Sequence, residues 1–235
     1  PKYYLEDGSL HSAEALVRWC SNGEIIHYPD EFIPIFEENG FITELDMYML
    51  EEACAFLNRL EKTGYADICI SVNQSRILFY KADYLNEIQR IIHKYHCAPS
   101  RIILEVTEGI TMDNLDEMKV LVRELHKMGF AVSMDDFGSG YSSLNILKEL
   151  DIDELKLDRV FLSDTAEKEK RDIIMKNIIT LARELQITTV TEGVEDAAQA
   201  EFIHSIHCDI GQGYYFAKPM PEDAFELFIA GKTEE

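Results

Sequence analysis

The stretch that decides the fold runs from residue 102 to residue 135, IILEVTEGITMDNLDEMKVLVRELHKMGFAVSMD. Its two ends, 102–107 and 130–135, alternate apolar and polar residues, which is typical of strands. Between them, apolar residues recur at helical spacing over 113–128, and Gly129 follows at the position where a helix C-cap is expected. Strand, helix and strand in this order favour a parallel sheet.

The same alternation extends along the rest of the chain. Strands are expected at 12–18, 68–73, 102–107, 130–135, 154–158, 187–192 and 210–216. Further helices are expected over 166–185 and 197–206, each entered through a capping-box pattern: Asp164 with Glu167, and Asp196 with Gln199. A mainly parallel sheet of about eight strands favours α/β closure into a TIM-like (β/α)8 barrel, and a doubly wound open sheet is the alternative.

The first strand is expected to run antiparallel to the second. Asp7-Gly8 lies between Tyr3-Tyr4-Leu5 and the strand that follows, and this pattern predicts a tight hairpin turn. The chain begins inside what looks like a strand, so we expect a truncated first strand. We interpret residues 1–235 as one domain, a fragment of a longer protein.

Composition limits the partners that this chain can take. It has 235 residues, 46% of them hydrophobic, and 22 basic against 44 acidic residues give a net charge of -22. Such a surface repels polymeric nucleic acid and anionic membranes, whereas divalent cations could bridge its carboxylates to a small anionic substrate. The five cysteines form no CxxC pair, which predicts reduced thiols in the cytoplasm. No apolar run is long enough to span a bilayer.

Polar residues share one face of several predicted strands, mostly near their C-terminal ends. They are Glu14 with Arg18, Ser71 with Asn73, Glu105 with Thr107, Ser133 with Asp135, and Lys156 with Asp158. In a barrel the apolar faces pack on the helices, so these side chains should point into the barrel mouth, where barrel enzymes keep their chemistry. The strand before Glu192 lacks clean alternation, so its pattern does not place that residue.

These acids together indicate a metal site. A single acid at a strand end is more often a helix N-cap or a solvated residue, but five strands ending in Glu, Asn, Glu, Asp and Lys are harder to explain in that way. Converging carboxylates repel one another unless cations neutralise them. Oxygen ligands without His or Cys favour Mg²⁺ or Mn²⁺ over zinc. Adjacent Asp135 and Asp136 could each reach a metal ion, with Asp135 bridging two, an arrangement that activates water and stabilises a phosphoryl group.

Eight short motifs occur in order along the chain. They are EALVRW at 14–19, EFIP at 31–34, VNQS at 72–75, LEVTE at 104–108, DDFGSGYSS at 135–143, KLDR at 156–159, EGVE at 192–195, and QGYYF at 212–216 with Lys218-Pro219. They resemble the motifs of the EAL-domain phosphodiesterases, and the first resembles the signature that names the family. Each motif alone is weak, whereas the ordered set is highly specific.

This resemblance implies a TIM-like barrel with an antiparallel first strand. It also implies hydrolysis of cyclic di-GMP to linear pGpG by two Mg²⁺ or Mn²⁺ ions, with inhibition by Ca²⁺. Glu14, Asn73, Glu105 and Asp135 match the ligands of one ion, and Asp135, Asp136 and Glu192 those of the other. Lys156 matches the lysine that helps to activate the attacking water, Glu108 a glutamate that tethers the loop after the aspartates, and Glu195 a supporting acid. Leu16, Arg18, Asp158 and Gln212 match substrate-binding or site-lining positions.

The resemblance further implies a homodimer formed through the loop and helix at 139–150, and we expect activity to rise with dimerisation. Ser139 stands where the family usually has Thr, and the strand that closes the family's barrel is mostly missing before Pro1. One alternative is a non-catalytic cyclic di-GMP receptor, although such members typically lose ligands that this chain keeps. A barrel enzyme of the enolase type is another, but it fits the Asp135-Asp136 pair and Asn73 poorly.

Overall fold

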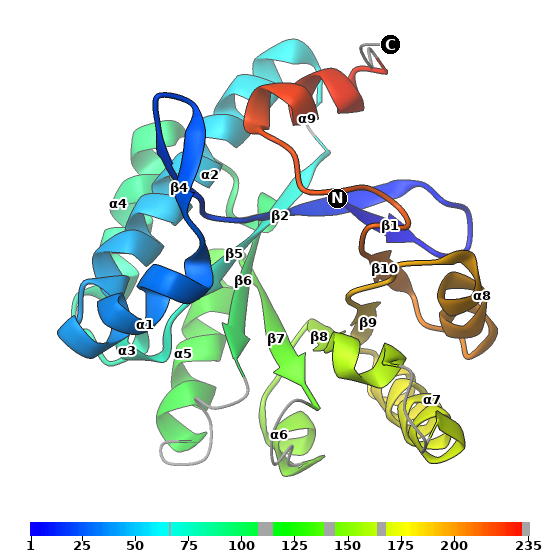
Figure 1. Cartoon of the computed structure of the whole chain (residues 1–235). Helices are drawn as coiled ribbons and strands as arrows, with labels where there is room; N and C mark the ends of the chain where they lie inside the picture. The colour runs from blue at the N-terminus through cyan, green and yellow to red at the C-terminus, as the bar shows by residue number, and fades with distance from the viewer. Residues whose placement is uncertain (66, 108–114, 139–143, 164–167, 232–235) are drawn as a thin grey trace.

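The computed structural model describes residues 1–65, 67–107, 115–138, 144–163 and 168–231, and within them eight strands form a closed barrel (Figure 1). The strands are β1 (Lys2–Tyr4), β2 (Leu10–Ala15), β5 (Cys69–Gln74), β6 (Ile102–Thr107), β7 (Ala131–Phe137), β8 (Glu154–Leu157), β9 (Thr188–Thr191) and β10 (Ile210–Gln212). Their order around the barrel is β1, β10, β9, β8, β7, β6, β5, β2. The predicted barrel is therefore confirmed, and the open sheet is excluded.

Strand β1 closes the barrel although it is only three residues long. It pairs antiparallel with β10 on one side and with β2 on the other, so that Lys2 lies opposite both Gln212 and Ser12. The turn between β1 and β2 is fixed by Asp7, whose Oδ1 accepts hydrogen bonds from the backbone N–H and the hydroxyl of Ser9. The expected antiparallel first strand is confirmed, and this short segment is sufficient for closure.

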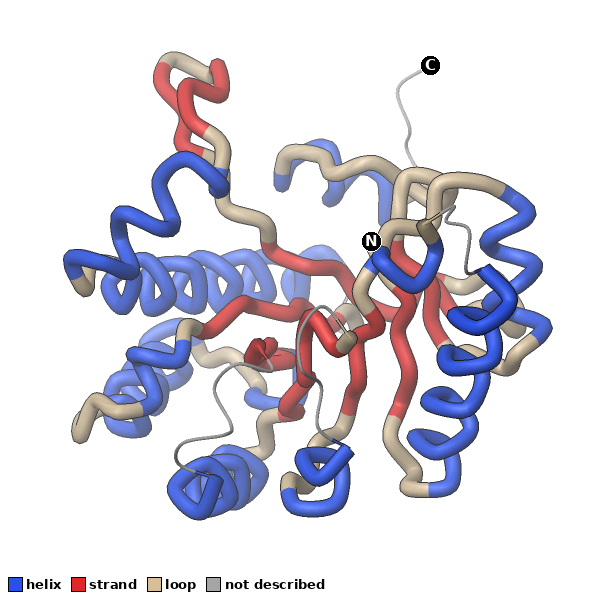
Figure 2. The backbone as a smooth tube through the Cα atoms, turned by 60° about the horizontal axis from the view of Figure 1, so that its bottom comes forward, coloured by secondary structure: helices blue, strands red, loops and turns tan. Residues whose placement is uncertain are grey.

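Helices surround the barrel (Figure 2). They are α1 (Pro29–Asn39), α2 (Ile42–Thr63), α3 (Arg76–Phe79), α4 (Tyr84–Tyr95), α5 (Leu115–Met128), α6 (Leu144–Glu149), α7 (Lys168–Glu184), α8 (Ala197–Ser205) and α9 (Glu222–Ile229), with 3-10 turns η1 (Pro99–Arg101) and η3 (Arg159–Leu162). Apolar residues of the central barrel strands, among them Val72, Leu104 and Val132, are fully buried in the core. Among the described helices, none combines the length and the apolar composition that a bilayer crossing requires.

The strand expected at 12–18 is shorter than predicted. It ends at Ala15, and a separate hairpin follows, made of β3 (Trp19–Ser21) and β4 (Glu24–His27). The indole ring of Trp19 packs on Phe32 of α1, with 5.6 Å between the ring centroids, which holds the hairpin to that helix. The prediction that Arg18 shares a strand face with Glu14 is therefore wrong, because Arg18 lies beyond the strand.

The strand expected at 210–216 is also shorter than predicted. It ends at Gln212, because Gly213 has a φ of +155° and lies so close to Val194 that a Cβ would be 2.2 Å from its carbonyl oxygen. The N-terminus of α8 is capped by Asp196, whose Oδ1 accepts from the N–H of Gln199 at 2.9 Å. The Gln199 side chain accepts from the N–H of Glu195 instead of that of Asp196. The capping box expected at Asp164 and Glu167 lies outside the described residues.

Candidate metal centre

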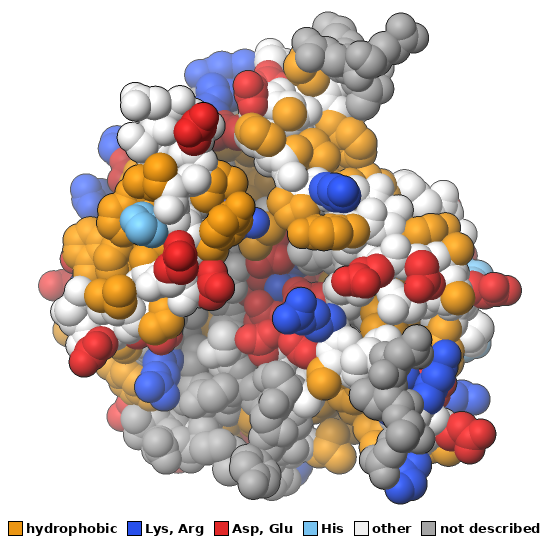
Figure 3. Space-filling view, viewed as in Figure 1, with side chains coloured by type: hydrophobic (Ala, Val, Ile, Leu, Met, Phe, Trp, Pro, Cys, Tyr) orange, Lys and Arg blue, Asp and Glu red, His pale blue; other side chains and the backbone are white. Residues whose placement is uncertain are grey.

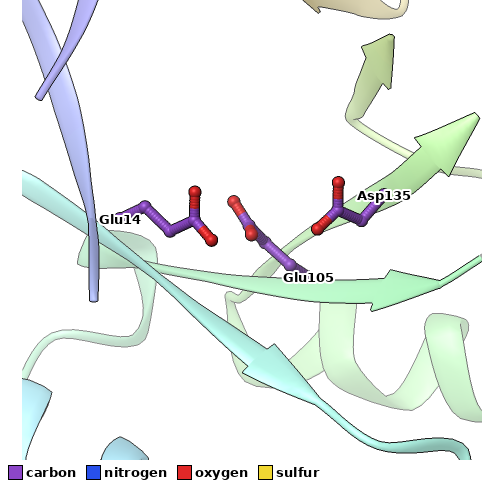
Figure 4. Close-up of side chains that lie close together, drawn as sticks. All are labelled: Glu14, Glu105 and Asp135. Carbon is purple, nitrogen blue, oxygen red and sulfur yellow. The ribbon is translucent and has the colours of Figure 1, made fainter. Parts of the chain in front are cut away.

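Acidic side chains converge at the C-terminal ends of the barrel strands. Figure 4 shows Glu14, Glu105 and Asp135 pointing toward one another from β2, β6 and β7, and one oxygen of each lies within 4.8 Å of the others. A second group with the same spacing comprises Asp135, Asp136 and Glu192. In the space-filling view, acidic side chains gather in a hollow at the centre of this face (Figure 3). The residues predicted to hold two ions therefore lie together, and Asp135 belongs to both groups.

A β-bulge brings the two neighbouring aspartates to the same side of β7. Successive residues of a regular strand point to opposite faces, so Asp136 would otherwise face away from the barrel mouth. The pairing of β7 with β8 shifts register between Met134 and Phe137, and Asp136 has a left-handed φ of +58°. Aspartate tolerates this conformation better than most residues. The Asp136 N–H also donates to Asp135 Oδ1 at 2.7 Å. The bulge therefore makes the bridging arrangement possible.

Lys156 lies at the centre of the acids and is 1% exposed. Its Nζ is 2.5 Å from Glu192 Oε1, 2.7 Å from Glu105 Oε2, 3.0 Å from Asp135 Oδ2 and 3.5 Å from Glu14 Oε2. Burial opposes the charged form, but Glu105 and the other carboxylates raise the pKa of Lys156 well above its ordinary value. The residue is therefore an ammonium group shared by four carboxylates.

The pKa values of the acids show that the two buried lysines offset the effect of burial at Glu105 but not at Asp135 or Glu192. Burial would raise the pKa of Glu105, but Lys156 and Lys2 lower it to about 2. Burial raises the pKa of Asp135 well above its ordinary value. Lys156 lowers this pKa, but the neighbouring carboxylates, Glu105 first among them, raise it further. Burial likewise raises the pKa of Glu192.

The charge and the donor atoms of the cluster fit two divalent cations. Its five carboxylates and one ammonium group leave four negative charges, which two divalent cations would neutralise. The five carboxylates belong to Glu14, Glu105, Asp135, Asp136 and Glu192. Oxygen donors of this kind suit Mg²⁺ or Mn²⁺.

Two amide side chains hold Glu14 in place. Asn73 donates from Nδ2 to Glu14 Oε1 at 2.9 Å, and Gln212 donates from Nε2 to Glu14 Oε2 at 2.7 Å. Since the Asn73 N–H group is turned to Glu14, its amide oxygen is the atom that could ligate a cation. The Oε1 atom of Gln212 is buried and has no hydrogen-bond partner among the described residues.

A second lysine, missed by the sequence analysis, lies below the cluster. Lys2 is fully buried, and its Nζ is 2.7 Å from Glu105 Oε1 and 3.2 Å from Glu154 Oε1. Glu154 also accepts a hydrogen bond from the hydroxyl of Ser133 at 2.9 Å. A single lysine in a short N-terminal strand does not stand out in the sequence. Its position inside the barrel follows from the pairing of Lys2 with Gln212.

A cavity of about 390 Å³ lies beside the acids. Leu16 and Arg18 line it together with Asn73 and Asp136, so two of the predicted substrate-binding residues adjoin two of the predicted ligands. Arg18 itself donates a hydrogen bond to the Val17 carbonyl. Another cavity, of about 410 Å³, lies at the opposite ends of β5 and β6, away from the acids.

The other predicted site residues are less closely involved. Asp158 caps η3 by accepting a hydrogen bond from the N–H of Val160. Burial is the largest cause of the raised pKa of Asp136, and the negative charge of Asp158 is the next largest. Glu195 is exposed, and its backbone N–H donates a hydrogen bond to Oε1 of Gln199. Glu108 lies outside the described residues.

The cavity wall also contains an acid that the sequence analysis did not single out. Asp46 of α2 is buried and accepts a hydrogen bond from the N–H of Ser75 at 2.8 Å. Burial raises the pKa of Asp46 to about 6. The sequence signal that could have identified Asp46 is its position on the apolar face of the amphipathic helix α2.

The chain is similar in sequence to known proteins over nearly its whole length. The family model of the EAL domain matches residues 1–219. The cyclic di-GMP phosphodiesterase NbdA of Pseudomonas aeruginosa is 37% identical over 97% of this chain and 29% of its own length. The bifunctional diguanylate cyclase/cyclic di-GMP phosphodiesterase MucR of the same organism is 36% identical over 98% of this chain and 34% of its own. This chain therefore spans about a third or less of these relatives.

The fold agrees with a solved structure of such a domain. The MucR phosphodiesterase, in complex with cyclic di-GMP, superposes with a TM-score of 0.89 at 36% sequence identity. The match covers 96% of this chain and 91% of that one. The barrel, the acid cluster and the family model agree, and this chain belongs to the EAL domain family.

Proposed function

We propose that this chain hydrolyses cyclic di-GMP to linear 5′-pGpG and so ends a bacterial second-messenger signal. The observation that carries the proposal is the pair of carboxylate groups that share Asp135 around the buried Lys156. The names of NbdA and MucR support the substrate, since both are called cyclic di-GMP phosphodiesterases. The MucR phosphodiesterase complex with cyclic di-GMP supports it further.

The acids would hold two Mg²⁺ or Mn²⁺ ions. One ion would take Glu14, Asn73, Glu105 and Asp135, and the other Asp135, Asp136 and Glu192. When bound, the cations would supply Lewis acidity that polarises the phosphate and acidifies the attacking water. We expect Ca²⁺ to inhibit, because it prefers longer bonds and more ligands than Mg²⁺.

Lys156 would act as a donor. Its ammonium group lies among the proposed ligands, so it can hydrogen-bond to the attacking water and orient it toward the phosphate. It also places fixed positive charge where the transition state gains negative charge. An interaction of this kind lowers the barrier more than it tightens binding of the substrate.

The cavity beside the acids would receive the substrate. The guanidinium of Arg18 suits a phosphate, because it can donate two parallel hydrogen bonds. Leu16 is 40% exposed and offers apolar surface to a base. Gln212 would act by holding Glu14, and Asp158 by its nearness to Asp136. For Glu195 and Glu108 we propose supporting roles.

We further propose that the chain acts in the cytoplasm as one module of a longer protein, and as a homodimer formed through residues 139–150. Residues 139–143 lie outside the described part of the chain, and helix α6 supplies the rest of this segment. Leu144 of α6 and Val120 of α5 are 56% and 52% exposed, which supports an apolar contact on this side.

Product analysis separates this proposal from its alternatives. Incubation with cyclic di-GMP and Mn²⁺, followed by chromatography, should yield pGpG with the wild-type chain and none with Asp135→Asn. A non-catalytic receptor would bind cyclic di-GMP and return it intact. Each proposed oxygen ligand is present among the described residues, which supports hydrolysis over the receptor. Failure of the wild-type chain to form pGpG with either Mg²⁺ or Mn²⁺ would refute the proposal.

A further inference from the structure

The two oxygens of Glu105 have different partners. Oε1 accepts from Nζ of Lys2 at 2.7 Å, and Oε2 accepts from Nζ of Lys156 at 2.7 Å. Both lysines and the Glu105 side chain are essentially excluded from solvent. The carboxylate is therefore held between a lysine of β1 and a lysine of β8.

Only one of these oxygens faces the acid cluster. Lys156, the partner of Oε2, is also 3.0 Å from Asp135 and 3.5 Å from Glu14. Lys2, the partner of Oε1, is instead 3.2 Å from Glu154, which lies below the cluster. Cations bound among the acids would contact Oε2 of Glu105, whereas Oε1 would remain hydrogen-bonded to Lys2.

We propose that Lys2 determines which divalent cation the site prefers, by restricting Glu105 to a ligand with one oxygen. The inference rests on the proposed metal-dependent function and extends it to a residue of β1. Ca²⁺ takes six to eight oxygens and often binds both oxygens of one carboxylate, whereas Mg²⁺ requires a compact octahedron. A carboxylate with one oxygen withheld suits Mg²⁺ and deprives Ca²⁺ of a ligand.

A purely structural role for Lys2 explains less of the geometry. Lys2 is nearer to Glu105 than to Glu154, and Glu154 has a further donor in Ser133. General repulsion between Lys2 and a bound cation does not explain selectivity either. Mg²⁺ and Ca²⁺ carry the same charge, so repulsion would weaken both to a similar degree. The ratio of the two affinities therefore isolates the effect on the ligand.

The test is isothermal titration calorimetry of the full chain with Mg²⁺ and with Ca²⁺. Lys2→Met removes the ammonium group and keeps most of the side-chain volume. Lys2→Met leaves the buried carboxylate of Glu154 without its lysine partner, which destabilises the fold. The double variant Lys2→Met with Glu154→Gln removes that unpaired charge. Glu154→Gln alone is the matched control, because it keeps the bond between Lys2 and Glu105.

In both variants without Lys2, the Ca²⁺ to Mg²⁺ affinity ratio should rise about tenfold, the lower end of the usual effect of a group that supports a metal ligand. The control should keep the wild-type ratio. A wild-type ratio in the double variant, or an equal change in the control, would overturn the inference. If the wild-type chain forms pGpG and the ratio does not change, only this inference fails. If the chain binds neither cation, the proposed function fails with it.

Discussion

Replacement of Lys156 by methionine should lower the stability of the metal-free protein and increase the stabilisation that bound divalent cations provide. The ammonium group lies within 3.5 Å of four carboxylates and is almost fully buried. In Lys156→Met the same acids stay buried and lose their shared counter-ion. Divalent cations bound among these acids would then supply the positive charge that the ammonium group provided.

The size of the effect follows from the burial. Removal of one partner from a buried ion pair costs about 3–5 kcal/mol. In a protein of this size each kcal/mol lowers the melting temperature by about 2–4 °C, so we expect a loss of about 6–20 °C in EDTA. A cation that replaces the missing charge restores much of this loss, whereas in the wild-type protein the ammonium group already stabilises the acids before the cation binds.

Thermal unfolding followed by circular dichroism, in EDTA and in Mg²⁺, measures both quantities. The rise in melting temperature on adding Mg²⁺ should be larger in Lys156→Met than in the wild-type protein, although kcat falls by about a hundredfold or more. Lys127→Met is the control, because Lys127 is 71% exposed and its pairing with Glu124 contributes little. An equal or smaller rise in Lys156→Met would show that the Lys156 ammonium does not stabilise the acids in the metal-free protein.

Three further substitutions test separate parts of the structure. Asp135→Asn should abolish pGpG formation, because the shared ligand loses its charge between two cations, and near wild-type turnover in Mg²⁺ would refute the two-cation site. Burial raises the pKa of Asp46 from 3.8 to about 6, so the cost of its ionised form is absent at low pH and complete above the folded pKa. The unfolding free energy of Asp46→Asn relative to the wild-type protein should therefore rise by up to about 3 kcal/mol from about pH 4 to about pH 7, measured by urea unfolding. A difference that does not change with pH would contradict this. Gly213→Ala should lower stability by about 1–3 kcal/mol or more, because its Cβ would overlap the Val194 backbone, and an unchanged urea midpoint would disprove that close contact.

The sequence predicted those features that depend on local pattern. Alternation at 102–107 and 130–135 placed Glu105 and Asp135 on the inner face of their strands, and the structure has them there. Apolar spacing likewise predicted the helix that ends at Met128. Such patterns are reliable because each strand of a barrel must turn one face to the helices.

Features that depend on distant contacts were not predictable in this way. Alternation alone placed Arg18 on a strand, whereas packing of Trp19 on α1 supports a separate hairpin there. The bulge that turns Asp136 inward appears only in the register between β7 and β8. Lys2 acquires its importance only where the two ends of the barrel pair.

That pairing has a consequence for the order of folding. Lys2 lies opposite Gln212 across the seam between β1 and β10, and Gln212 donates to Glu14, 198 residues earlier in the chain. Contacts between such distant segments are slow to form, because closing a long loop costs conformational entropy. Strands β5 to β8 can bring most of the acids together before the seam exists. In refolding, full affinity for the cation should therefore arise last, when β1 and β10 pair.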